Sequence, residues 1–185
     1  AVERLSYEEI MAVSEQPWIV RLALQPGERT QVGEVDLRFS GPAVQDPQSM
    51  AIFKRVRDSW PLRRGEPFRQ SEWDAAKRRA LREMSTFRYA GARIAKSEAR
   101  IDPQTRRASL MVELESGPPY RFGEIRVTGT RRYSDELVQN LSPVRPGDDY
   151  DRDKLVIYQR TLLESGYFVS VQADVDRDAS SPDSA

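Results

Sequence analysis

The sequence predicts an α+β protein in which a small unit, with the order strand, helix, helix, strand, strand, is used in tandem. The chain has 185 residues, a length that suits one medium domain or two small ones. An internal repeat favours two. The repeated features, given as pairs, are residues 32–37 and 122–127, residues 62–68 and 144–150, and Tyr89 and Tyr167. Tandem arrays of small units usually hold or guide other chains, so a scaffolding role is expected.

The composition excludes several classes of function. The 29 basic residues balance the 29 acidic ones, which argues against a protein that binds nucleic acid by neutralising phosphates. The sequence contains no histidine and no cysteine, so the usual general base, the common zinc ligand and any disulfide are missing. We therefore expect no enzyme activity, no cofactor, no metal and no nucleic-acid partner.

Residues 1–31 are interpreted as the C-terminal hairpin of a preceding unit that is truncated. Residues 18–24 have the pattern of a strand. The turn that follows, at residues 25–28, is similar to the one at residues 115–119 that closes the next unit. The chain is therefore expected to begin inside one unit and to continue into another.

A complete unit is predicted over residues 32–120. It opens with a half-buried strand, because the apolar side chains of Val35, Leu37 and Phe39 alternate with charged ones. Asp46 is a favourable N-cap and is followed directly by a proline, which predicts that a short helix starts there. The apolar face of this helix comprises Ile52, Phe53 and Val56.

A second, longer helix follows in the same unit. Ser71 and Asp74 resemble a capping box at its start. Its apolar side comprises Trp73, Ala76, Ala80, Leu81 and Met84. Beyond this helix, Asp102 and the proline after it predict a turn. Residues 108–114 then return as a buried strand, which completes the unit.

The following unit is predicted over residues 121–185 and repeats this order. Its first strand covers residues 122–127. Ser134 and Asp151 each precede a helical pattern and are expected to act as N-caps. Residues 169–175 alternate as a strand, but the polar residues after them offer no further strand. The second unit is therefore expected to lack its last strand.

The order and spacing of these motifs resemble those of POTRA domains, the periplasmic repeats of outer-membrane barrel-assembly proteins, and most nearly those of the TamA type, the translocation and assembly module subunit. The motifs that carry the resemblance comprise residues 33–35, 40–42, 65–68, 101–107, 117–123 and 165–168. The resemblance implies that each unit is a three-stranded mixed sheet covered on one face by two helices. Two positions depart from the pattern of the second unit, because Arg88 stands where Gly166 does and Ala90 where Phe168 does.

The resemblance also implies a cellular setting. It places the chain in the periplasm, as part of an outer-membrane protein of a Gram-negative bacterium that acts in autotransporter biogenesis. The implied partners are unfolded outer-membrane protein clients, an inner-membrane-anchored partner of the assembly module, and an outer-membrane barrel of the same chain. We expect the inner-membrane partner to contact mainly the truncated first unit, and the barrel to lie outside this sequence.

A region of this kind is expected to act as a scaffold for the assembly or translocation of outer-membrane proteins. It would guide clients by strand addition at exposed sheet edges and would space the membrane barrel from its partner. The alternative is the POTRA region of a two-partner-secretion transporter, which recognises one exported client. The full-length gene would separate the two, by three units before a barrel or two units with a plug helix.

Two sheet edges are candidate sites for adding a peptide strand. Their residues are Arg93, Ile94, Ala95, Lys96, Ser97, Glu98, Ala99, Ile101, Val169, Val171, Ala173 and Val175. The first edge has a commoner structural interpretation, because Lys96, Glu98 and Arg100 would protect an edge against aggregation. The second edge is more apolar, and its structural interpretation is that it faces the missing last strand.

The joint between the two units is expected at Gly117, Pro118, Pro119 and Tyr120. The connection is short, and its prolines have a fixed φ. A short, proline-stiffened linker predicts a restricted hinge between the units.

Two charged clusters are weaker candidates. The acidic residues within 148–153 offer oxygen ligands, but they lack the spacing of a calcium-binding loop. The arginines at positions 63–64 and 78–79 would form a solvated face or a contact with lipid headgroups. A solvated face is the expected role of these arginines, and no metal is expected at the acidic cluster.

Overall fold

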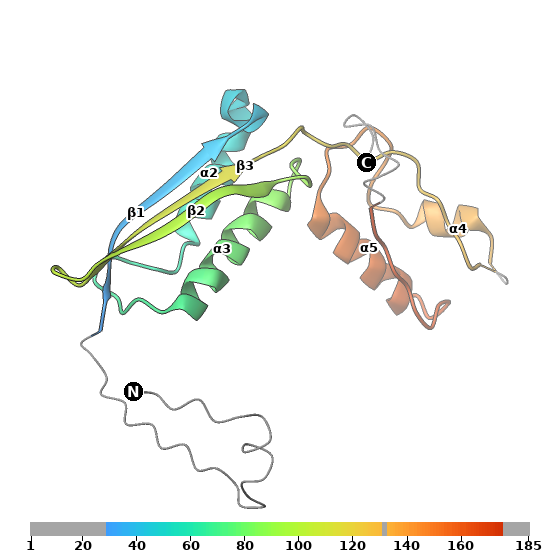
Figure 1. Cartoon of the computed structure of the whole chain (residues 1–185). Coiled ribbons are helices and arrows are strands. Elements are labelled where there is room, and N and C mark those ends of the chain that lie inside the picture. The colour runs from blue at the N-terminus through green and yellow to red at the C-terminus, as the bar shows by residue number, and fades with distance from the viewer. Residues whose placement is uncertain (1–28, 131–132, 176–185) are drawn as a thin grey trace, which may run out of the picture.

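The computed structural model describes residues 29–130 and 133–175. Its strands are β1 (Gln31–Ser40), β2 (Arg93–Asp102) and β3 (Arg107–Glu115) (Figure 1). Its helices are α2 (Met50–Asp58), α3 (Gln70–Ser85), α4 (Asp135–Asn140) and α5 (Arg152–Glu164), and two short 3-10 turns, η1 (Pro42–Gln45) and η2 (Pro47–Ser49), precede α2. The hairpin predicted within residues 1–31 lies almost wholly outside the described residues.

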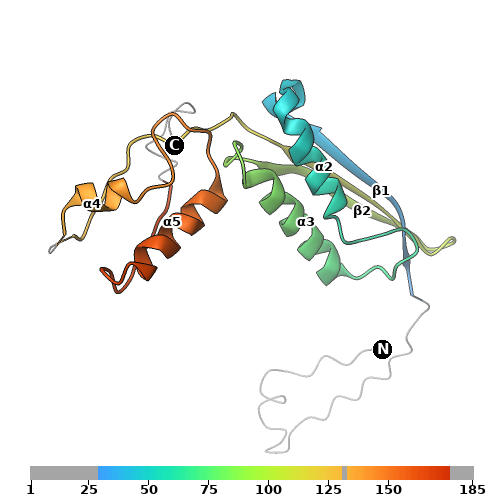
Figure 2. The ribbon, with the colours of Figure 1, turned by 180° about the vertical axis from the view of Figure 1, so that it is seen from behind.

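The three strands form one mixed sheet in the order β1-β3-β2. β1 runs parallel to β3 and β2 runs antiparallel to it, so β3 is hydrogen-bonded on both sides. Helices α2 and α3 lie together over one face of this sheet (Figure 2). This is the three-stranded mixed sheet with two helices on one face that was predicted, and the fold class is confirmed.

Strand β3 supplies the centre of the core, because its alternate side chains all point toward the helices. Those side chains, each at most 2% exposed, are Ala108, Leu110, Val112 and Leu114. They join the buried residues of α2 and α3 in one cluster. Full burial of a leucine or valine stabilises a fold by about 1.5–3 kcal/mol relative to an exposed position. The helix layer is therefore held to the sheet chiefly through its middle strand.

The start of α2 follows the prediction. The Asp46 carboxylate accepts a hydrogen bond from the backbone N–H of Gln48 at 2.9 Å and so caps the turn η2. This turn leads directly into α2. The buried residues of α2 are the three predicted ones, Ile52, Phe53 and Val56.

The capping box predicted at the start of α3 is wrong. The helix begins at Gln70, and its N-cap, Arg69, makes no side-chain capping bond. Ser71 therefore lies inside the first turn, and Asp74 pairs with Lys77 at 3.0 Å. The apolar face is as expected, with Leu81 at its margin and with four buried residues, Trp73, Ala76, Ala80 and Met84.

Both N-caps predicted for the second unit are present. At the start of α4, the Ser134 hydroxyl accepts a hydrogen bond from the backbone N–H of Leu137 at 3.4 Å. At the start of α5, the Asp151 carboxylate accepts one from the N–H of Asp153 at 2.9 Å. Gly166 follows α5 with a φ of 73°, the left-handed conformation in which many helices end.

The turn before the longer helix has the same hydrogen bonds in both units. The Val32 N–H donates to the Glu66 carbonyl at 2.7 Å, and the Phe122 N–H donates to the Asp148 carbonyl at 2.8 Å. The turn glycine has a φ of 91° in each case. The repeat read from the sequence is thus also a repeat of backbone geometry.

The strands predicted at residues 122–127 and 169–175 are not formed, which corrects the sequence analysis. Neither segment has a hydrogen-bonded strand beside it in the described structure, and a strand requires that ladder. Their side chains still alternate, because Ile125, Val127 and Val171 are half-buried between exposed neighbours. The two segments therefore have the apolar pattern of strands without a partner.

We predict that Leu114→Ala lowers the free energy of unfolding by about 2–5 kcal/mol, because it leaves a cavity at the centre of the sheet. Urea denaturation followed by circular dichroism measures this change. Met111→Ala is the matched control, since Met111 lies on the same strand but is only half-buried. An equal loss in both variants would contradict this account of the core.

Candidate functional site

Strand β2 forms one edge of the sheet and carries the first candidate site. It is hydrogen-bonded to β3 on one side only, so the backbone groups on its other side have no strand partner in the described structure (Figure 1). The predicted residues lie together in this one strand of ten residues. An unpaired backbone edge of this length is a template to which another extended chain can add.

Charged side chains accompany this edge. Arg100 pairs with Glu98 at 2.9 Å, and Arg93 pairs with Glu115 of β3. Such exposed pairs add little stability, but charge along an edge discourages unspecific association. The register shift after Ile94 also discourages unspecific association, because it interrupts the regular hydrogen-bonding edge. The outer backbone groups of β2 are therefore available to an added strand, while its charged side chains discourage unspecific association.

Strand β1 forms a second edge, which the sequence analysis missed. It pairs with β3 alone. The signal was present in the element order, because the first and second strands must both lie at edges when the third is central. A register shift between Val32 and Val35, and an ion pair of 2.7 Å between Arg38 and Asp36, mark this edge.

The second predicted edge, residues 169–175, does not form the edge of a sheet. Val169 is fully exposed. Val171 and Val175 pack against two small clusters of buried residues in the second unit, and Ala173 is half-buried. Val171, Ala173 and Val175 line a groove.

The joint between the units contains more than the predicted linker. Gly117 has a φ of 65° and packs against Gly91. Three backbone bonds then form a ring. The Tyr120 N–H donates to the Arg88 carbonyl at 2.6 Å, the Arg88 N–H to the Tyr150 carbonyl at 2.8 Å, and the Tyr150 N–H to the Tyr120 carbonyl at 3.0 Å. These bonds connect residues 88, 120 and 150, which are far apart in the sequence.

The other linker residues act in different ways. Pro118 is half-buried and Pro119 is exposed, and both restrict the backbone. The ring of Tyr120 covers Gly91, where an added Cβ would come within 3.2 Å of the ring. Only a residue without a side chain fits beneath the ring unless the ring shifts.

The side chain of Arg88 connects the two units as well. Its φ of 59° lies in the left-handed region that favours glycine. Its side chain is 14% exposed, and its guanidinium lies 3.2 Å from the carboxylate of Asp46 and 3.7 Å from that of Asp149. The side-chain amide oxygen of Gln48 accepts a hydrogen bond from it. Asp46 and Gln48 belong to the first unit and Asp149 to the second, so this one cation bridges both.

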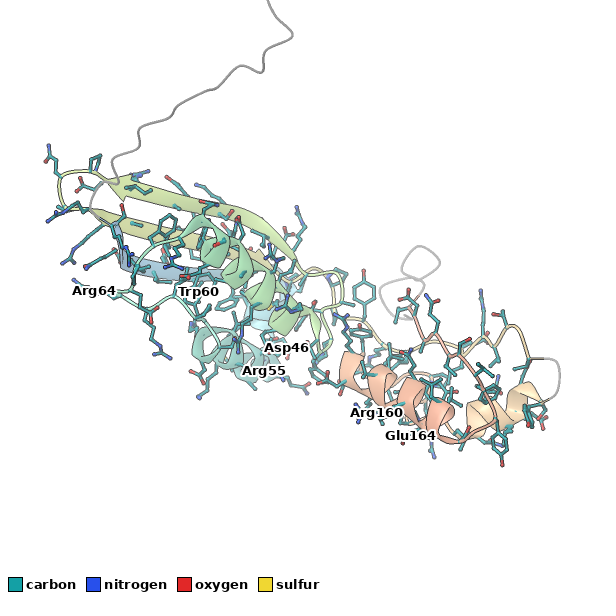
Figure 3. The ribbon with its side chains drawn as sticks, turned by 90° about the horizontal axis from the view of Figure 1, so that it is seen from below. Asp46, Arg55, Trp60, Arg64, Arg160 and Glu164 are labelled. Carbon is teal, nitrogen blue, oxygen red and sulfur yellow. The ribbon has the colours of Figure 1, made fainter. Side chains whose placement is uncertain are left out.

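Asp46 is also tied to the core, and it lies at the end of the first unit that is nearest the second (Figure 3). The buried Tyr89 donates its hydroxyl hydrogen bond to Asp46 at 2.7 Å, and the Ser49 hydroxyl lies 2.7 Å from the same phenol oxygen. The bond from Tyr89 is the main cause that lowers the pKa of Asp46, with smaller contributions from the Gln48 N–H and the Arg88 charge. Burial raises the pKa of Tyr89, which keeps it protonated as a donor.

Ala90, the second departure seen in the sequence, has a place in the same joint. It is buried in a cluster with Phe122, Val144 and Tyr150. The rings of Phe122 and Tyr150 lie 5.6 Å apart within this cluster. Phe122 and Tyr150 of the second unit therefore pack in one cluster with the methyl group of Ala90 from the first unit.

The acidic residues before α5 have structural roles. Asp148 accepts a hydrogen bond from the Arg145 N–H at 3.0 Å. Asp149 faces Arg88, and Asp151 caps the helix. Within residues 29–130 and 133–175, no group of three or more such side chains is placed to hold a metal ion. The helices in those ranges are also too short or too polar to cross a membrane.

Comparison with known proteins gives the same architecture. Residues 120–184 match the family model described as POTRA, surface antigen variable number repeat. The crystal structure of Haemophilus influenzae BamA POTRA3-5 is 15% identical, with a TM-score of 0.61, over 83% of this chain and 58% of that one. BamA from Haemophilus ducreyi lacking POTRA domains 1-3 is 11% identical, with a TM-score of 0.60, over 82% of this chain and 27% of that one. The chain therefore has the POTRA fold and spans less than two thirds of either structure.

We predict that acid weakens the first unit partly through Asp46. Its pKa is lower in the folded state than in the unfolded chain, so ionised Asp46 stabilises the fold above the unfolded value of about 4. This stabilisation is lost as the pH falls through the lower, folded value.

Urea denaturation of wild type and Asp46→Asn, between about pH 7 and about pH 2.5, measures the effect. The difference in unfolding free energy should shrink as the pH falls. Asp58→Asn is the control, because that side chain is 63% exposed and pairs with Lys54 of its own helix. A difference for Asp46→Asn that is the same at every pH would contradict the prediction.

We predict that Arg88→Ala loosens the joint, because it removes the contacts with Asp46 and Asp149 that bridge the units. Small-angle X-ray scattering and ¹⁵N relaxation should show one tumbling body in the wild type and partly independent units in the variant. Arg121→Ala is the matched control, since Arg121 also faces Asp149, at 3.8 Å, but is 57% exposed. Freely tumbling units in the wild type would show that the hinge is not restricted.

Proposed function

We propose that this chain is the periplasmic scaffold and client-guiding region of an outer-membrane protein assembly or translocation factor of the TamA type. The observation that carries the proposal is the free backbone edge of β2 in a sheet of the POTRA fold. The similar structures of known title are POTRA-containing parts of BamA. The order of motifs in the sequence is what favours the TamA type among such proteins.

Strand addition explains how one surface serves many clients. An added strand bonds mainly through its backbone, so affinity depends little on the side chains of the client. The charges of Arg93, Glu98 and Arg100 stand beside the edge. They make unspecific apolar association unfavourable while the backbone groups stay available. Unfolded outer-membrane proteins, which must form strands to mature, are the proposed clients.

The joint supports the spacing part of the proposal. Arg88 and the ring of backbone bonds connect the second unit to the first, and we propose that they hold it in a fixed position. A fixed pair of units holds β2 at a set distance from whatever follows the second unit, which we propose to be an outer-membrane barrel of the same protein. The inner-membrane-anchored partner is proposed to contact mainly a unit that precedes residue 32.

The proposed organisation follows the repeat. Residues 1–31 would end one unit, residues 32–120 would form a complete unit, and residues 121–185 would belong to the next, without its last strand. The equivalent hydrogen bonds made by Val32 and Phe122 support the boundary between the last two. The role proposed is that of a binding scaffold, without catalysis.

The test is a titration of the ¹⁵N-labelled chain with an extended peptide copied from a strand of an outer-membrane protein. Two versions of the peptide carry N-methyl groups, one at alternate residues and one at every residue. Only the first version should shift the resonances of Arg93–Asp102, because it keeps the N–H groups on one side free to bond a neighbouring strand.

The other sheet edge, Gln31–Ser40, is an internal control within the same spectra. Equal binding of the two N-methylated versions would show that the contact is not a strand ladder. No shifts in β2 at millimolar peptide would show that β2 does not take up clients.

A further inference from the structure

The exposed side of helix α5 carries two neighbouring aliphatic residues. Val156 is 49% exposed and Ile157 is 53% exposed, near the middle of a helix of 13 residues. Neither of them belongs to, or packs against, a buried cluster of the described residues. The side of a helix that faces water is usually polar, so the packing of this chain alone does not account for the two side chains.

The repeat shows that this part of the helix does not require aliphatic residues. Counted from the N-cap of each helix, Val156 stands where Asp74 does in α3. Ile157 stands where Ala75 does, and Ala75 is exposed. This side of α3 stays exposed although the sheet of the first unit has all its strands. The exposure of Val156 and Ile157 is therefore independent of whether the sheet of their own unit is complete.

Helix propensity does not account for the two residues either. Both are β-branched, and such side chains lose rotational freedom in a helix. Alanine, lysine or glutamate would favour the helix more. The apolar surface of Val156 and Ile157 contributes to stability only when something covers it. Residues that break a local rule without local compensation are typical of functional surfaces.

Two opposite charges flank this aliphatic pair on the same side of α5. Asp153 precedes Val156 by three residues and Ile157 by four. Arg160, labelled in Figure 3, follows Ile157 by three residues and Val156 by four. Residues three and four apart share one side of a helix. Asp153 and Arg160 are exposed, and neither makes an ion pair within residues 29–130 and 133–175.

We infer that this side of α5 binds the same side of α5 in a second copy of the chain, with the two helices antiparallel about a two-fold axis. The axis lies between Val156 and Ile157, because the four residues are spaced symmetrically about that point. Val156 of each copy then meets Ile157 of the other. Asp153 of each copy meets Arg160 of the other, so the charges are self-complementary, as a two-fold contact requires. The contact has an apolar centre and a charged rim, the usual arrangement of an interface.

A contact made by one helix is small. It buries less than the roughly 1,600 Å² of a standard interface, so the dimer is expected to be weak and to form at high protein concentration. The inference rests on α5 and on its comparison with α3, and it does not depend on the proposed function.

Sedimentation velocity of the whole chain at low salt, between about 10 μM and about 1 mM, tests the association. The wild type should shift toward a dimer as the concentration rises. Ile157→Lys should stay a monomer, because it places a charge at the centre of the contact. Ala75→Lys is the matched control at the same place in α3 and should associate like the wild type. A wild type that is monomeric throughout would overturn the inference and would leave the surface to a different polypeptide or to lipid.

Charge reversal tests the two-fold arrangement. Asp153→Arg and Arg160→Glu should each weaken association about tenfold, because each puts like charges opposite one another at two places in the dimer. An equimolar mixture of the two variants should restore the wild-type affinity, since each copy then supplies the charges that the other needs. Mixing cannot repair a misfolded variant, so a mixture that stays monomeric would overturn the arrangement.

The matched charge control is again in α3. Arg78 has the place in α3 that Arg160 has in α5. Arg78→Glu should not restore association when it is mixed with Asp153→Arg, and restoration would mean an unspecific attraction between opposite net charges. Association through the free edge of β2 would be unchanged in every α5 variant and would also overturn the inference. The α5 variants should still show the peptide-induced shifts of β2, so the two proposals fail separately.

Discussion

The architecture depends on a strand that has neighbours on both sides. β1 and β2 do not pair with each other, and each is a strand because β3 lies between them. β3 also fixes the helix layer through its buried side chains. The second unit has the same turn and also two helices, yet its two outer segments form no ladder in the described residues. A helix bonds within itself, whereas a strand needs another strand.

This difference explains how much of the fold could be predicted from the sequence. The turn at Asp102 is formed as expected, because its carboxylate accepts hydrogen bonds from the Gln104 N–H at 2.9 Å and the Thr105 hydroxyl at 2.7 Å. Such bonds join near neighbours and leave a local pattern. The apolar alternation at residues 122–127 and 169–175 predicted the partly buried side chains except at Val169, which is fully exposed, and it predicted the strands wrongly. Alternation of apolar residues shows which side of a segment is apolar, whereas a strand ladder also requires a partner strand elsewhere in the fold.

The sequence likewise predicted some parts of the candidate site and not others. The extent of β2 was predicted to within a residue, and its place at an edge through the resemblance to POTRA domains, while the β1 edge required the order of strands. Arg88 and Ala90 were visible only as departures from a repeat. Their partners, such as Asp149 and Tyr150, come from the next unit. No spacing rule connects residues that meet only once both units have folded.

The joint also sets the order in which the molecule comes apart. In a tandem array, the free energy of each unit includes a term from its interface with the neighbour. Here that term comes from backbone bonds between the units, including one of 2.9 Å from the Arg152 N–H to the Thr86 carbonyl. The first unit has a complete sheet of its own, and the second has no ladder in its described residues. We therefore expect the second unit to open at a lower free energy than the first, which can stay folded on its own sheet. Because a coupling free energy is reciprocal, the interface stabilises both units to the same extent.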